Sequence, residues 1–125
     1  MGKRIIITDD EPLLVRVFAA YLSKAGYEVI KTFDDGDALV QSLKSSGQSS
    51  DILILDYRMP KMDGLAAAKI LKPIFPQMKI VLCSAYPLAE KSSMDLFDAV
   101  LQKPVSGKAL VETISELADD SKCST

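Results

Sequence analysis

Three short apolar segments of this chain end directly in acidic or basic residues. Each has the apolar composition of a buried strand, and the charged residues follow in this order: Asp9-Asp10 after 5–8, Asp56 after 52–55 and Lys103 after 100–102. Parallel strands finish on the same side of a sheet, and ligands bind at that carboxyl edge in open α/β sheets. The sequence therefore predicts one site with three carboxylates and one ammonium, which suits a divalent cation and a phosphoryl group.

Strand-like and helix-like segments alternate along the chain. We expect strands at 3–8, 27–32, 52–55, 79–83 and 99–102 and helices at 12–25, 35–43, 64–71 and from about 106. This alternation predicts an α/β fold, a three-layer sandwich with helices on both faces of a parallel sheet. A chain of 125 residues, 48% of them hydrophobic, suits one domain. We expect that domain at 1–119 and a frayed polar tail at 120–125.

Prolines and glycines predict where the helices begin and end. Pro12 fits a first helical turn, with Asp10 as its cap. Gly26 fits the end of that helix, and Pro73 with Pro76 should stop the helix that begins at Gly64. The segment 88–97 has the weakest pattern, and we expect a short helix there.

Composition excludes several classes of function. The net charge is −2 and the basic residues are scattered, so neither nucleic acid nor a membrane surface is expected as a partner. No apolar stretch approaches the roughly 20 residues of a membrane span, and no secretory leader is evident, so we expect a cytoplasmic protein. The chain has no histidine, which excludes Ser-His and Cys-His nucleophiles and the usual zinc sites.

Taken singly, the charged residues have ordinary explanations. An Asp-Asp pair often caps a helix, and a Lys-Pro step is usually a solvated turn. However, two carboxylates about 5 Å apart repel by roughly 3 kcal/mol at an effective dielectric of 20, so a cluster of three favours a raised pKa or a bound cation. Carboxylate and main-chain oxygens suit Mg²⁺.

These residues resemble the receiver domain of two-component response regulators, of the chemotaxis-regulator kind. The resemblance covers nearly the whole chain and rests on four elements in order: the acidic pair Asp9-Asp10, the run from Asp56 through Met59-Pro60 to Asp63-Gly64, the pair Ser84-Ala85, and Lys103-Pro104, whose peptide bond is commonly cis in the family. It implies a flavodoxin-like sheet of strand order 2-1-3-4-5.

The resemblance implies a phosphorylation switch within a phosphorelay. Asp56 would accept a phosphoryl group from a histidine kinase or a histidine phosphotransfer protein. Lys103 would pair with a phosphoryl oxygen, and the Ser84 hydroxyl would donate to another. Such a domain is a signalling switch that catalyses only its own phosphorylation and dephosphorylation. The surface made by the fourth helix, the fifth strand and the fifth helix would then change its affinity for a downstream protein.

The same resemblance implies a Mg²⁺ or Mn²⁺ ion as cofactor. Asp10 and Asp56 would bind the metal directly, together with the main-chain carbonyl of Arg58, and Asp9 would act through a bound water. The metal would offset charge on the transferred oxygens.

Two features depart from the family pattern. Val100 occupies the position that commonly holds a switching aromatic residue, and the interval from Ser84 to Lys103 is short by about one helical turn. Tyr86 and Arg58 flank the predicted site at positions that modulate loss of the phosphoryl group in the family. We expect Tyr86 to shield the acyl phosphate from water, with a surface tyrosine packed on the following segment as the alternative.

Other functions stay open at this point. The chain could be a stand-alone receiver or a piece of a larger regulator or hybrid kinase. It could be a receiver-like interaction module that works without phosphorylation. A more remote alternative is an aspartate-nucleophile phosphatase of the haloacid dehalogenase kind, but that class needs a second Asp where this chain has Arg58.

Overall fold

The structure is a computed structural model, and it describes residues 3–85 and 95–118. The elements of the described part are β1 (Arg4–Thr8), α1 (Pro12–Lys24), β2 (Glu28–Phe33), α2 (Gly36–Ser46), β3 (Ile52–Asp56), α3 (Gly64–Ile74), β4 (Lys79–Ser84), β5 (Ala99–Gln102) and α4 (Gly107–Ala118). Strand and helix alternate as the sequence predicted, apart from the segment between β4 and β5. Most of that segment, and the tail from residue 119, lie outside the described residues.

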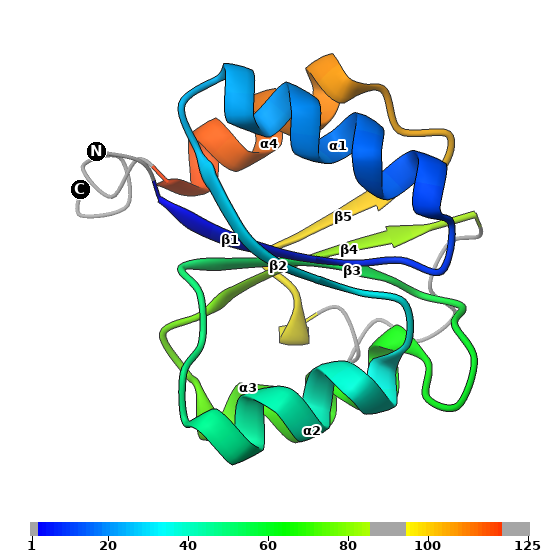
Figure 1. Cartoon of the computed structure of the whole chain (residues 1–125), viewed down its shortest axis with the longest axis vertical. Coiled ribbons are helices and arrows are strands. Elements are labelled where there is room, and N and C mark those ends of the chain that lie inside the picture. Colours follow the sequence, from blue (N-terminus) through cyan, green and yellow to red (C-terminus); the bar gives the residue numbers. More distant parts are fainter. Residues whose placement is uncertain (1–2, 86–94, 119–125) are drawn as a thin grey trace.

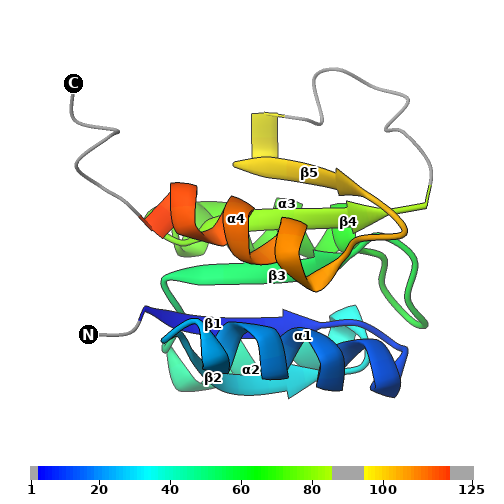
Figure 2. The same cartoon turned by 90° about the horizontal axis from the view of Figure 1, so that it is seen from above.

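The five strands form one parallel sheet in the order β2-β1-β3-β4-β5, which confirms the expected order. Figure 1 shows the three layers, with α1 and α4 on one face of the sheet and α2 and α3 on the other. Viewed from above, the strands run in the same direction, so their carboxyl ends lie together along one edge (Figure 2). None of the described helices is long and apolar enough to cross a membrane.

Two apolar clusters hold the layers together, one on each face of the sheet. Alternate residues of β1 point to opposite faces, so Ile5 and Ile7 join the cluster under α1 and α4, while Ile6 joins the cluster over α2 and α3. All five residues of β3 are buried, as expected for a central strand that helices cover on both sides. Burial of this strand fixes the position of Asp56 at its end.

Side-chain caps begin three of the helices, including α4, where the Ala109 N–H donates to the Ser106 hydroxyl at 3.0 Å, and a glycine ends α2. Asp35 accepts a hydrogen bond from the Ala38 N–H at the start of α2, and Asp63 accepts one from the Ala66 N–H at the start of α3. Gly47 follows α2 with φ 68°, a left-handed conformation that favours glycine.

Two predicted helix boundaries were wrong. Asp10 does not cap α1, because Glu11 is the cap residue and makes no side-chain cap bond. Pro73 lies inside α3, which ends at Ile74 just before Pro76. Pro73 has no N–H to donate to the carbonyl four residues earlier, and the helix ends one residue after it.

Candidate functional site

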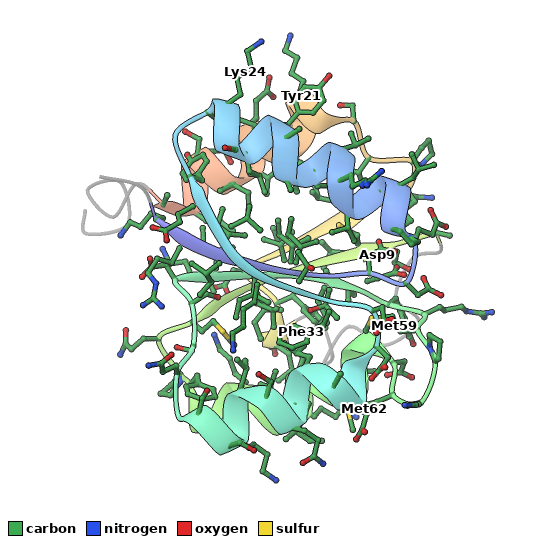
Figure 3. All side chains as sticks on the ribbon, in the orientation of Figure 1. Asp9, Tyr21, Lys24, Phe33, Met59 and Met62 are labelled. Carbon is green, nitrogen blue, oxygen red and sulfur yellow. The ribbon has the colours of Figure 1, made fainter. Side chains whose placement is uncertain are left out.

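Three carboxylates meet at the carboxyl edge of the sheet. Asp9 follows β1, Asp10 follows it in the loop to α1, and Asp56 is the last residue of β3. One carboxylate oxygen from each lies within 4.8 Å of the others. Asp9 and Asp56 are buried and Asp10 is exposed, so the cluster has a closed floor and one open side. Figure 3 labels Asp9 at this end of the sheet.

Lys103 brings a positive charge into the same cluster. Its Nζ lies 3.0 Å from Asp56 Oδ1 and 3.3 Å from Asp9 Oδ2. The side chain comes from just beyond β5, where the Lys103 N–H donates to the Ser84 carbonyl at 2.7 Å and the Lys103-Pro104 peptide bond is cis. The ammonium therefore joins the ends of β1 and β3 from a third strand, as the sequence predicted.

Burial controls the acidity of the two inner carboxyl groups. Desolvation raises the pKa of Asp56 to about 6, although the hydrogen bond and charge of Lys103 act in the opposite direction. Desolvation also raises the pKa of Asp9. Burial alone would lower the pKa of Lys103, but its hydrogen bond to Asp56 and the charges of Asp9 and Asp56 raise it overall. At neutral pH, Asp56 is thus mostly ionised and faces a cation.

The donor set fits a hard divalent cation. The carboxylates of Asp9, Asp10 and Asp56 supply oxygen ligands, and Mg²⁺ is bound in proteins by a few carboxylates and several waters. Exposure of Asp10 leaves room for those waters. One carboxylate oxygen of Asp9 accepts from the Glu11 N–H at 3.0 Å and the other faces Lys103. Both oxygens of Asp9 already have partners, which suits a role through water.

The remaining predicted site residues lie around this cluster. Ser84 is buried at the end of β4 and is paired in register with Gln102. Arg58 is exposed two residues after Asp56, so its carbonyl is near the cluster along the chain, and its role as a metal ligand stays a prediction. Tyr86 lies outside the described residues, so its shielding role is also untested.

A close approach of two backbones supports Asp56, and sequence analysis missed it. A Cβ added to Gly64 would overlap the main-chain oxygen of Asp56, so α3 begins directly against the end of β3. The Gly64 N–H donates to the Tyr57 carbonyl at 2.6 Å, and the Tyr57 N–H donates to the Cys83 carbonyl at 2.9 Å. The glycine of the Asp63-Gly64 step was the available signal.

The loop between β3 and α3 is also held from its far side. A Cβ on Gly36, the first residue of α2, would overlap the main-chain oxygen of Met62. In the same loop Lys61 has φ 68°, and its ammonium lies 4.0 Å from Asp35. Met59 and Met62 mark this loop in Figure 3. Packing on α2 therefore fixes the segment that follows Asp56.

Val100 stands at the position where the family commonly has a switching aromatic residue. It lies in β5, is partly buried, and packs against the cluster between the sheet and α2–α3. The neighbouring Phe97 is buried with that cluster. An aliphatic side chain therefore fills the position that commonly holds an aromatic residue in the family.

Comparison with known proteins agrees with this geometry. The family model described as "Response regulator receiver domain" matches residues 5–115. The chemotaxis protein CheY of Thermotoga maritima is 38% identical over 85 residues, which are 68% of this chain and 69% of the relative.

Solved structures agree as well. A CheY-like receiver domain from Methanospirillum hungatei superposes with a TM-score of 0.86, with 25% identity and full coverage of both chains. TrrA from Thermotoga maritima, a response regulator solved in complex with Mg²⁺-BeF, superposes with a TM-score of 0.80 and 29% identity, over 92% of this chain and 98% of that one. With the matching family model, the strand order and the acidic cluster beside Lys103, these similarities show that the chain belongs to the response regulator receiver domain family of two-component signalling.

Proposed function

We propose that this receiver domain is a phosphoacceptor, with Asp56 as the residue that is modified. The observation that carries the proposal is the position of the Lys103 ammonium, 3.0 Å from Asp56 and 3.3 Å from Asp9, beside an acidic cluster that can hold a cation. A carboxylate held beside two centres of positive charge is placed to attack an anionic phosphoryl group.

The chemistry follows from the charges of the side chains. A carboxylate oxygen of Asp56 attacks phosphorus, an O–P bond forms, and the bond from phosphorus to the donor breaks, leaving its electron pair on the donor. The Lys103 ammonium, which is paired with Asp56 before transfer, then forms an ion pair with a phosphoryl oxygen. Ser84 supplies a hydroxyl donor from the end of β4. Mg²⁺ held by Asp10, Asp56 and the Arg58 carbonyl, with Asp9 acting through water, would offset charge on the phosphoryl oxygens.

The donor in this proposal is a histidine kinase or a histidine phosphotransfer protein in the cytoplasm. Phosphorylation adds about −1.5 to −2 charge and three acceptor oxygens, which draws Ser84 towards the site. We propose that the surface on β5 and α4, with the segment between β4 and β5, then binds a downstream protein. Val100 of β5 is aliphatic, so this switch would proceed without a change of rotamer at an aromatic side chain.

The test is phosphorylation by a small donor. The purified chain is incubated with acetyl phosphate and Mg²⁺, beside an Asp56→Asn variant, and the intact mass is recorded. One phosphoryl adduct, absent in the variant and absent after chelation of the metal, is expected. An adduct of equal yield in Asp56→Asn would refute the assignment of Asp56, and no adduct in folded wild-type protein would favour an interaction module that works without phosphorylation.

A further inference from the structure

The first residue of α2 lies directly against the loop that follows Asp56. A Cβ added to Gly36 would overlap the main-chain oxygen of Met62 and would lie 3.1 Å from its main-chain carbon. Met62 lies beside the start of α2 in Figure 3, and Gly36 is buried. Because the obstacle is backbone rather than the end of a flexible side chain, a side chain at position 36 requires the helix or the loop to move.

The helix is held in place on its side of this contact. The Asp35 side chain accepts a hydrogen bond from the Ala38 N–H at 2.6 Å, and the Asp35 carbonyl accepts one from the Leu39 N–H at 3.3 Å. Leu39 is fully buried in the cluster between the sheet and α2–α3. A cap and a buried anchor within the first turn oppose a shift of the helix. A side chain at position 36 would therefore displace the loop rather than α2.

The loop transmits such a displacement towards Asp56. Two hydrogen bonds tie the loop back on itself, because the Met62 N–H donates to the Pro60 carbonyl at 2.7 Å and the Gly64 N–H donates to the Tyr57 carbonyl at 2.6 Å. Gly64 in turn lies against the main-chain oxygen of Asp56. A loop closed in this way does not absorb a push at one point locally, so the main chain on both sides of Pro60 moves with Met62.

The same main chain supplies a proposed ligand of the metal. The Arg58 carbonyl belongs to the closed part of the loop, between Tyr57 and Pro60, and the Asp56 carboxylate precedes it. Mg²⁺ demands near-octahedral geometry with ligand distances of about 2.0–2.1 Å, whereas Ca²⁺ accepts about 2.3–2.6 Å and a more flexible geometry. A displaced loop therefore weakens the binding of Mg²⁺ more than the binding of Ca²⁺.

We propose that Gly36 is a positioning residue for the metal site. Its lack of a side chain lets α2 pack against Met62, and this packing fixes the main chain after Asp56 in the arrangement that selects Mg²⁺. Gly36 acts through the loop and is not a ligand. The inference rests on the proposed function and adds to it a distant element of the chain, the start of α2, that sets the selectivity of the site.

A glycine at the other end of the same helix is the matched control. Gly47 has φ 68°, so Gly47→Ala strains the backbone and costs stability. Within the described part of the chain, however, its added Cβ meets no atom within 4 Å beyond its chain neighbours and its own helix. Mg²⁺ and Ca²⁺ are titrated separately into the ¹⁵N-labelled wild-type chain, Gly36→Ala and Gly47→Ala. The dissociation constants are taken from the amide resonances, which also report whether each variant is folded.

We expect Gly36→Ala to weaken Mg²⁺ binding by about tenfold, the size of effect that changes behind a metal ligand commonly have. Ca²⁺ binding should weaken by no more than about threefold, and both constants in Gly47→Ala should stay within about twofold of wild type. Unchanged Mg²⁺ binding in folded Gly36→Ala, or an equal loss for the two ions, would overturn the positioning role and leave the proposed function standing. No Mg²⁺ binding by the wild-type chain would instead overturn the metal site of the proposed function.

A second measurement needs no variant and therefore decides the matter if Gly36→Ala does not fold. A contact that couples the start of α2 to the metal site acts in both directions. Mg²⁺ added to the wild-type chain should shift the amide resonances of Gly36 and Asp37, at the start of α2, and leave those of Ser45 and Ser46, at its end, in place. Shifts that are absent from Gly36 and Asp37, or that are as large at Ser45 and Ser46, would overturn the proposal.

Discussion

The Nζ atom of Lys103 lies 3.0 Å from Oδ1 of Asp56, at the ends of two strands that are not neighbours in the sheet. The same ammonium lies 3.3 Å from Asp9, so one cation serves two buried carboxylates. Its position has two consequences. It partly offsets the repulsion among the carboxylates of the acidic cluster. Its positive charge also opposes the binding of a divalent cation to the same carboxylates.

Removal of the Lys103 charge should destabilise the metal-free domain and tighten metal binding. We expect Lys103→Met to lower the free energy of unfolding in EDTA by about 3 kcal/mol, because two buried carboxylates lose their partner. The same variant should bind Mg²⁺ about tenfold more tightly, because a neighbouring positive charge no longer opposes the ion. Urea unfolding in EDTA and calorimetric Mg²⁺ titration measure the two effects. Lys108→Met, at an exposed position on α4, is the control and should change neither; weaker Mg²⁺ binding in Lys103→Met would contradict the prediction.

Stability without metal should increase as the pH falls. The pKa of Asp56 is about 6 in the folded chain against 3.8 for an ordinary aspartate, so between these values the folded state binds more protons than the unfolded state. The contribution of Asp56 is therefore unfavourable above pH 6 and is relieved as the pH falls towards 3.8, by up to about 3 kcal/mol. The raised pKa of Asp9 acts in the same direction. Urea unfolding in EDTA at pH 7.5 and pH 5.0 measures the difference.

The Asp56→Asn variant is the control for this pH dependence. It lacks the titrating carboxyl group, so its stability should vary much less between the same pH values, and at pH 7.5 in EDTA it should be more stable than the wild-type chain. The raised pKa of Lys103 lies above this pH range, so the charge of Lys103 does not change within it. A wild-type chain that loses stability on acidification from pH 7.5 to 5.0 would argue against a raised pKa at Asp56.

A methyl group at Gly64 should disturb the end of β3. In Gly64→Ala the new Cβ meets the main-chain oxygen of Asp56, and neither the strand nor the start of α3 can move freely. We expect a loss of about 2 kcal/mol or more in the free energy of unfolding and a slower phosphorylation of Asp56 by acetyl phosphate. Lys69→Ala, at an exposed position of the same helix, is the comparison and should change the free energy of unfolding by less than about 0.5 kcal/mol. Equal losses in the two variants would contradict the prediction.

The hydroxyl of Thr8 should be dispensable for stability. Thr8 is fully buried, and its Oγ1 has no hydrogen-bond partner among the described residues. Valine has nearly the same shape without the polar atom, so Thr8→Val should raise the free energy of unfolding by about 1 kcal/mol. Thr32→Val, at an exposed position of β2, should change it by less than about 0.5 kcal/mol. A clear loss of stability in Thr8→Val would mean that the hydroxyl has a partner in solution.

The alternation of strands and helices was sufficient to predict a parallel sheet, and the three apolar runs that end in charged residues predicted the gathering of Asp9, Asp10, Asp56 and Lys103. The order of the strands followed from the resemblance to the family. The positions at which helices begin and end were harder to predict. Pro73 reads as a stop signal, yet α3 continues past it by one residue, to Ile74.

Contacts between segments far apart in the chain could not be predicted. The approach of Gly64 to the Asp56 carbonyl and that of Gly36 to the Met62 carbonyl depend on how two loops and two helices dock. A glycine in a sequence permits such an approach but does not name its partner.

The most direct test of the central claim is to locate the phosphoryl group on the chain. After incubation with acetyl phosphate and Mg²⁺, the acyl phosphate is reduced with borohydride, which converts the modified aspartate to homoserine, and the digested chain is sequenced by mass spectrometry. We predict homoserine at position 56 and unmodified aspartate at positions 9 and 10. Homoserine at Asp9 or Asp10, with Asp56 intact, would contradict the assignment of Asp56 as the phosphoacceptor.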